Sequence, residues 1–152
     1  MAGLTIPLKS EEATAKLGAS LAPVLAASDV ILLSGDLGAG KSTLARGLIK
    51  VLCGHTVAPS PTFTFVATYA AEDFSLWHFD LYRLERAEDV WELGLEDALN
   101  DGATLIEWPE RMGRLAPADA LVIRLEIDGG GRMAVINPNE SWRKRLAAAG
   151  IV

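Results

Sequence analysis

The chain has 152 residues, half of them hydrophobic and 22% charged, and its formal net charge is −6. This composition is typical of a folded globular domain and excludes a disordered or fibrous chain. The negative charge also argues against a protein that grips nucleic acid through its own surface, because that affinity comes mainly from lysine and arginine. We therefore expect any role with RNA to be indirect.

The sequence indicates a protein of a reducing compartment, which we take to be the cytoplasm. Its single cysteine, Cys53, cannot form an intramolecular disulfide. The apolar stretch 17–33 is interrupted by Pro23, Ser28 and Asp29, and no basic start with a cleavage site precedes it. We expect neither a membrane span nor export.

The first third of the chain predicts a helix, a strand and a second helix. Ser10 is a candidate helix N-cap, and apolar residues follow it at helical spacing to about Ala26. Residues 30–33 are an apolar run that ends at a glycine-rich turn, which suits a buried parallel strand. Residues 42–52 are again helical in pattern, and Gly54 is a natural stop.

The middle of the chain predicts a hairpin, a broken helix and a strand. Residues 62–69 and 76–82 are β-prone runs separated by a polar segment, as in an antiparallel pair. Residues 87–100 carry apolar side chains among acids and suit a helix broken near Gly94. Residues 103–107 form another short apolar run, which predicts a strand.

The C-terminal part predicts a second hairpin and a terminal helix. Apolar and polar residues alternate over 121–127, and a turn leads toward 133–136; the terminal helix covers 140–149. We find no internal repeat or long linker. The expected fold is a single P-loop NTPase-like α/β domain over residues 1–152, in three layers. A mainly parallel central sheet carries antiparallel hairpin strands, and helices cover both faces.

The turn between the first predicted strand and its helix carries the pattern Gly35-x4-Gly40-Lys41-Ser42. Glycines let the backbone aim its N–H groups at phosphate oxygens, and the following helix adds its positive N-terminal end. Lys41 would reach the β- and γ-phosphates, and the Ser42 hydroxyl would bind Mg²⁺. The residues predicted to hold the nucleotide here are Asp36, Leu37, Gly38, Ala39, Gly40, Lys41, Ser42 and Thr43.

Two acids, Asp80 and Glu107, follow apolar runs and stand where a sheet's carboxyl edge would meet ligand. A phosphate loop needs one such acid to hold Mg²⁺, and spacing alone does not rank them. His78 shares the Asp80 side of its strand, so it is either the hydrogen-bonded partner of Asp80 or a structural histidine. Trp108 precedes Pro109, which predicts an extended Trp108 backbone. Its ring either packs beside a base or covers the sheet edge.

Further segments follow the phosphate loop in order: Ser60-Pro61-Thr62-Phe63, then His78-Phe79-Asp80-Leu81-Tyr82-Arg83-Leu84, then Ile106-Glu107-Trp108. Together with residues 35–43 they resemble the bacterial TsaE family, and the resemblance extends over roughly residues 10–136. The chain has Ser42 where the family more usually has threonine, and either hydroxyl binds Mg²⁺. The resemblance implies an ATPase required to make threonylcarbamoyladenosine beside the anticodon of tRNAs that read codons beginning with A.

The resemblance also implies roles for individual residues. Ser42 and Glu107 would be the Mg²⁺ ligands, and Asp80 a second acid near the γ-phosphate that positions water or responds to the phosphate. Thr62 would lie on a switch-like loop. Trp108 would lie near the adenine. The cofactors implied are ATP and Mg²⁺, and the residues expected to act on the phosphates are Lys41, Thr62 and Asp80.

The family works with the proteins TsaB and TsaD, so the resemblance implies a slow ATPase that resets their complex and meets tRNA only through it. A non-catalytic, nucleotide-gated adaptor stays open as an alternative. A GTPase is disfavoured, since the guanine-reading Asn-Lys-x-Asp pattern is absent. A small-molecule kinase also stays open, although it needs an arginine-rich lid, for which the chain offers only the scattered Arg83, Arg86, Arg111 and Arg114.

Overall fold

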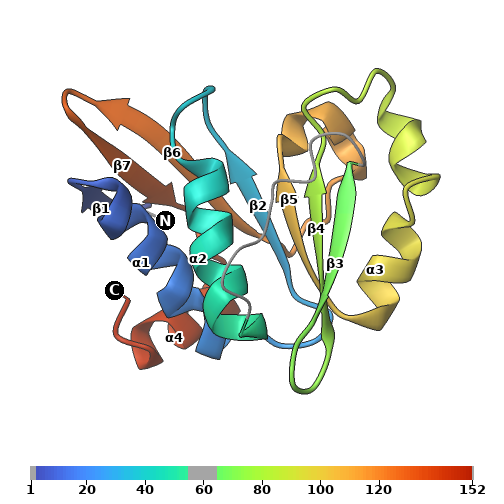
Figure 1. The fold of residues 1–152 in the computed structure, drawn as a ribbon, viewed down its shortest axis with the longest axis horizontal. Coiled ribbons are helices and arrows are strands. Elements are labelled where there is room, and N and C mark those ends of the chain that lie inside the picture. The colour runs from blue at the N-terminus through green and yellow to red at the C-terminus, as the bar shows by residue number, and fades with distance from the viewer. Residues whose placement is uncertain (1–2, 55–64, 152) are drawn as a thin grey trace.

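The computed structural model describes residues 3–54 and 65–151 of the chain. In that part, seven strands form one sheet in the order β1-β7-β6-β2-β5-β4-β3 (Figure 1). The central strands run parallel: β6 (Leu121–Asp128), β2 (Val30–Ser34), β5 (Ala103–Glu107) and β4 (Ser75–Asp80). The antiparallel strands lie at the two edges: β1 (Leu4–Leu8), β7 (Gly131–Ile136) and β3 (Val66–Ala70).

Helices cover both faces of the sheet, which confirms the predicted three-layer α/β fold. Figure 1 shows α1 (Glu11–Leu21) and α2 (Lys41–Cys53) side by side, with α4 (Glu140–Ala148) near their lower ends. The 3₁₀ turn η1 (Ala22–Val24) continues α1. The opposite face is covered by η2 (Ala87–Trp91), α3 (Leu95–Asp101) and η3 (Pro109–Leu115), of which η2 and η3 are 3₁₀ helices.

The central strand β2 is buried on both faces because its side chains alternate between two hydrophobic clusters. Ile31 and Leu33 pack in the cluster that contains Leu44 of α2. Leu32 packs in the other cluster, with Leu95 of α3. The short apolar run therefore forms the buried parallel strand that its composition predicts.

The helices α1 and α2 are in very close contact. A Cβ added at Gly18 would stand 2.0 Å from the Leu44 carbonyl oxygen, and one added at Gly47 would stand 2.1 Å from that of Ala15. Only glycine allows this approach, because backbone atoms cannot give way as a flexible side chain can. The contact fixes the N-terminus of α1 beside that of α2, where the glycine-rich turn lies.

The predicted helix and strand boundaries hold to within a few residues, with three differences, one of which is the unpredicted 3₁₀ helix η3. The helix predicted over 87–100 does break at Gly94, which has φ 94°, but its first part is a 3₁₀ helix. The strand β1 was not predicted; it contains Pro7, which cannot donate a ladder hydrogen bond and is tolerated because β1 lies at the sheet edge. Residues 62–64 of the first predicted hairpin lie outside the described residues.

None of the helices found in residues 3–54 and 65–151 has the length and apolar character that crossing a membrane requires.

Candidate nucleotide site

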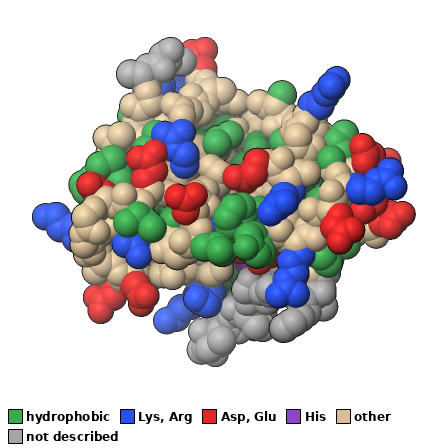
Figure 2. Space-filling model, turned by 90° about the horizontal axis from the view of Figure 1, so that it is seen from above, with side chains coloured by type: hydrophobic (Ala, Val, Ile, Leu, Met, Phe, Trp, Pro, Cys, Tyr) green, Lys and Arg blue, Asp and Glu red, His purple; other side chains and the backbone are tan. Residues whose placement is uncertain are grey.

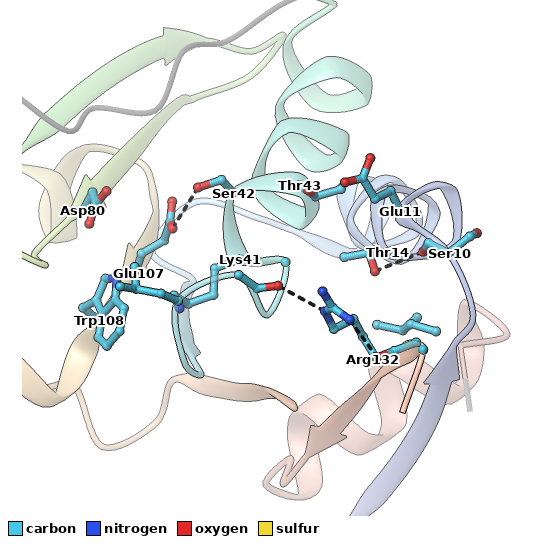
Figure 3. A pocket seen from close by; sticks show the side chains of 16 residues that line it. Ser10, Glu11, Thr14, Lys41, Ser42, Thr43, Asp80, Glu107, Trp108 and Arg132 are labelled. Atoms are coloured by element: carbon cyan, nitrogen blue, oxygen red, sulfur yellow. Dashed lines mark hydrogen bonds between the residues drawn. The ribbon is translucent and has the colours of Figure 1, made fainter. Parts of the chain in front are cut away.

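A cavity of about 490 Å³ lies around the N-terminus of α2, at the carboxyl ends of the parallel strands (Figure 3). This volume falls within the range of about 300–1,000 Å³ that small-molecule sites occupy. Figure 3 shows the phosphate-loop residues between two groups of side chains. One group is Asp80, Glu107 and Trp108, and the other is Ser10, Glu11, Thr14 and Arg132.

The loop before α2 has the backbone that its glycines predict. Gly35, Gly38 and Gly40 have φ values of 137°, 81° and 107°, a region that favours glycine. A Cβ at Gly35 would also stand 2.4 Å from the Leu125 carbonyl oxygen of β6. Gly40 is the N-cap of α2 and has no side chain to cap the helix, so the first-turn N–H groups border the pocket as donors for an anion.

Lys41 is 5% exposed, and its side chain folds back over the loop. Its Nζ donates hydrogen bonds to the carbonyl oxygens of Gly35 and Asp36, the latter at 2.9 Å. The same Nζ lies 4.0 Å from the centre of the Trp108 ring, within the range of a cation–π contact. The ammonium is thus held at the loop by two neutral carbonyl acceptors and an aromatic face.

The charge on Lys41 is incompletely compensated. Burial lowers the pKa of its ammonium, and the carboxylates of Glu107, Glu110, Asp80 and Asp36 act in the opposite direction without cancelling that effect. A cation that burial disfavours is stabilised when an anion comes within a few ångströms. The electrostatics of Lys41 therefore favour an incoming phosphate.

Glu107 is the last residue of β5 and is 2% exposed. Its Oε1 accepts a hydrogen bond from the Ser42 hydroxyl at 3.4 Å, and its Oε2 lies 2.6 Å from His78 Nε2. Asp80 lies opposite Glu107 in the β4–β5 register and accepts a hydrogen bond from the Tyr82 backbone N–H at 3.1 Å. The structure thus brings both predicted acids to the pocket and places Glu107 beside Ser42.

His78 pairs with Glu107, so the suggested pair of His78 with Asp80 is wrong. The reason is the strand register: His78 lies opposite Leu105, and Glu107 lies two residues further along the same face of the sheet. The imidazole therefore contacts Glu107 on the neighbouring strand β5 and not Asp80 on its own strand β4.

The extended backbone predicted for Trp108 is also wrong, since its φ of 61° and ψ of 50° are left-handed. Its N–H donates to the Leu33 carbonyl at 3.1 Å, and Pro109 then begins η3, so the chain must turn sharply at Trp108. The ring lies 4.9 Å from that of Tyr82 and borders the pocket. Its contact with a nucleotide base stays a prediction.

Some pocket residues were missed by the sequence analysis. Arg132 of β7 donates from Nε to the Gly38 carbonyl at 3.1 Å across 94 residues of chain. Glu11 and Thr14 reach the pocket from the first turn of α1. No motif marks these residues, because only the packing of α1 and the β1–β7 edge against the loop brings them there. Thr62 lies outside the described residues.

The residues present fit a Mg²⁺-nucleotide. A serine hydroxyl and a buried carboxylate stand 3.4 Å apart at the N-terminus of a helix, and oxygen atoms of this kind are the ligands that Mg²⁺ prefers. Mg²⁺ in such sites is usually held by one or two carboxylates together with substrate phosphates. The helix N-terminus and Lys41 supply the donors and positive charge that those phosphates need.

The fold and this loop are those of an α/β protein of the P-loop NTPase-like class. The model of the family described as "Threonylcarbamoyl adenosine biosynthesis protein TsaE" matches residues 8–134. The chain belongs to the TsaE family, whose role is in tRNA threonylcarbamoyladenosine biosynthesis, and the resemblance seen in the sequence is confirmed.

Relatives support the same assignment, and one solved structure has the same fold. The protein "tRNA threonylcarbamoyladenosine biosynthesis protein TsaE" of Rickettsia conorii is 45% identical over 87% of this chain and 77% of its own length. Its namesake in Nostoc sp. is 42% identical over 86% of this chain and 83% of its own length. The crystal structure of Bacillus subtilis YdiB superposes with a TM-score of 0.80 at 25% identity, covering 97% of this chain and 94% of that one.

Proposed function

We propose that this protein is a Mg²⁺-dependent, slow ATPase that supports the formation of threonylcarbamoyladenosine next to the anticodon of tRNAs by resetting a complex of TsaB and TsaD. The observation that carries the proposal is the buried Lys41 at the phosphate loop, with the Ser42 hydroxyl and the Glu107 carboxylate in contact beside it. A loop, a lysine, a hydroxyl and an acid in this arrangement are what Mg²⁺-ATP requires.

The phosphates would be bound by the loop N–H groups and by Lys41. Its Nζ would exchange the carbonyl oxygens of Gly35 and Asp36 for phosphate oxygens, which are stronger acceptors because they are charged. Ser42 and Glu107 would hold Mg²⁺, which when bound neutralises phosphate charge. Trp108 would contact the nucleotide, since its ring lines the pocket beside Lys41.

We propose that Asp80 positions the water molecule that attacks the γ-phosphate. Asp80 lies opposite Glu107 in the strand register and its carboxylate accepts from the Tyr82 N–H, so it can orient a water molecule or respond to the γ-phosphate. Thr62 is proposed to act as a switch residue. Contact with TsaB and TsaD would complete the arrangement, which is why turnover by the chain alone should be poor.

We propose that tRNA is met only through the partner proteins, in the cytoplasm. Figure 2 looks onto the edge where the strands end, and its described part shows acidic and basic side chains interspersed around hydrophobic ones rather than one basic surface. With a net charge of −6, the isolated chain should bind tRNA weakly. Nanomolar binding of tRNA by the chain alone at physiological salt would contradict this.

The test is ATP hydrolysis by the purified chain, alone and with TsaB and TsaD, repeated with Lys41→Ala and Glu107→Ala. We expect the partners to stimulate hydrolysis and both substitutions to abolish the stimulation. Phosphate transferred to an added small molecule would instead identify a kinase. Tight ATP binding without turnover in the complete complex would identify a nucleotide-gated adaptor.

A further inference from the structure

The Glu107 carboxylate is held from two directions. One oxygen, Oε1, accepts from Ser42 at 3.4 Å, and the other, Oε2, lies 2.6 Å from His78 Nε2. The side chains of His78 and Glu107 are each 2% exposed. A carboxylate buried to this degree is strongly destabilised unless a donor replaces its lost water, and His78 supplies that donor.

The surroundings of His78 indicate which proton the imidazole carries. Its other nitrogen, Nδ1, is buried and has no hydrogen-bond partner within the described residues. An ionised carboxylate only accepts, so Nε2 carries the hydrogen that it donates to Glu107. A ring with its hydrogen on Nε2 alone leaves Nδ1 as a bare acceptor, and buried acceptors without a partner are tolerated more often than buried N–H groups without one. A hydrogen on Nε2 therefore fits both the contact with Glu107 and the unpartnered Nδ1.

His78 acts on the pocket only through Glu107. Glu107 lines the cavity, whereas His78 is not among its lining residues and approaches the carboxylate from the interior of the sheet. With Oε2 tied to the imidazole, the rotation of the carboxylate is fixed and Oε1 is left facing Ser42. This is how a hydrogen bond outside a metal site orients a ligand inside it.

We propose that His78 is a positioning residue that presents Glu107 to Mg²⁺, an inference that rests on the metal site of the proposed function. Loss of such an outer hydrogen bond typically weakens metal binding by about 10–100-fold. The histidine itself touches neither the nucleotide nor the metal.

A matched pair of variants tests this role. His78→Gln keeps an N–H donor at about the reach of Nε2, whereas His78→Met has a similar length and no donor. Mg²⁺ is titrated into each variant with a fluorescent, non-hydrolysable ATP analogue, and the apparent Mg²⁺ affinity is read from anisotropy. We expect His78→Met to weaken Mg²⁺ by about tenfold or more and His78→Gln by clearly less. Both variants should bind the analogue in EDTA as the wild type does.

A double-mutant cycle separates positioning from a merely structural effect. In a Glu107→Gln background, His78→Met should cause no further loss of Mg²⁺ affinity. Equal losses in His78→Met and His78→Gln, or an undiminished loss in the Glu107→Gln background, would overturn the role of His78. If His78→Met does not fold, as judged by thermal unfolding, His78→Asn replaces it, since its shorter side chain does not reach Glu107.

Failure of the proposed metal site has a different signature. In that case Mg²⁺ would not change the affinity of the wild type for the analogue, or Glu107→Gln would leave the Mg²⁺ effect intact. Either result overturns the positioning role together with the site. A Mg²⁺ effect that Glu107→Gln removes and His78→Met does not touch overturns the positioning role alone.

Discussion

Two of the walls of the pocket are built by different means. The loop wall, residues 35–43, is continuous in sequence, and its shape comes from backbone conformations at Gly35, Gly38 and Gly40. The acid wall consists of Asp80, Glu107 and Trp108, with His78 behind them, and the pairing of β4 with β5 brings it together. The loop wall can be recognised from a short sequence motif. The acid wall depends on the register between two strands, which no short motif contains.

The largest expected effect comes from breaking the loop wall at its backbone. Gly35→Ala forces a left-handed φ on alanine and drives its Cβ to 2.4 Å from the Leu125 carbonyl oxygen. We expect the free energy of unfolding to fall by about 3 kcal/mol and nucleotide affinity by roughly 100-fold or more. Denaturant unfolding and a binding titration measure the two effects.

The control for Gly35→Ala is Gly38→Ala in the same loop. Gly38 also has a positive φ, of 81°, but an added Cβ meets no atom of the described structure within 4 Å. Gly38→Ala should therefore lower the free energy of unfolding only by the backbone strain, about 1 kcal/mol. Equal losses in the two variants would show that the close approach to β6 does not shape the loop.

A smaller effect should follow from Asp80→Asn on the acid wall, because this change leaves the backbone alone. The amide oxygen of asparagine can still accept the Tyr82 N–H, so the fold should persist. We expect partner-stimulated ATP hydrolysis to fall by about 100-fold at saturating Mg²⁺-ATP, with the Mg²⁺ affinity nearly unchanged. Glu107→Gln should instead weaken mainly the Mg²⁺ affinity. If Asp80→Asn weakens Mg²⁺ more than Glu107→Gln does, the metal-binding acid is Asp80.

The smallest effect concerns the helix beside the loop wall. The Ser10 hydroxyl caps α1 by accepting from the Ala13 N–H at 3.1 Å. Ser10→Ala should therefore lower the free energy of unfolding by about 1 kcal/mol, measured by denaturant titration. Ser20→Ala is the matched control, since the Ser20 hydroxyl only donates to the Leu17 carbonyl within the helix. A loss in Ser20→Ala as large as that in Ser10→Ala would argue against a capping role.

Most of the fold was predictable because its elements leave local signals. The alternation over β6, the apolar runs of β2 and β5, and the cap at Ser10 each follow from a few neighbouring residues. The strand β1 was missed for a physical reason. Its five residues include Pro7, and its ladder is formed with β7 near the other end of the chain.

Only those parts of the candidate site that come from short continuous segments of the sequence were predictable. Six residues of the loop line the pocket together with the two strand-end acids: Leu37, Gly38, Gly40, Lys41, Ser42 and Thr43. The predicted Asp36 and Ala39 are not among the lining residues. The partner of His78, the left-handed backbone at Trp108 and the presence of Arg132 all depend on contacts between distant segments. These three features could not be predicted, because the segments that determine them are far apart in the sequence.

The contact of α1 with α2 through Gly18 and Gly47 has a mechanical consequence. Backbones packed this closely leave no room for one helix to shift toward the other, so the position of α1 constrains that of α2. The residues at the N-terminus of α2 include Lys41 and Ser42, so the placement of α1 also constrains the phosphate loop. The surface of α1 that faces away from α2 is therefore mechanically connected to the phosphate loop through this contact.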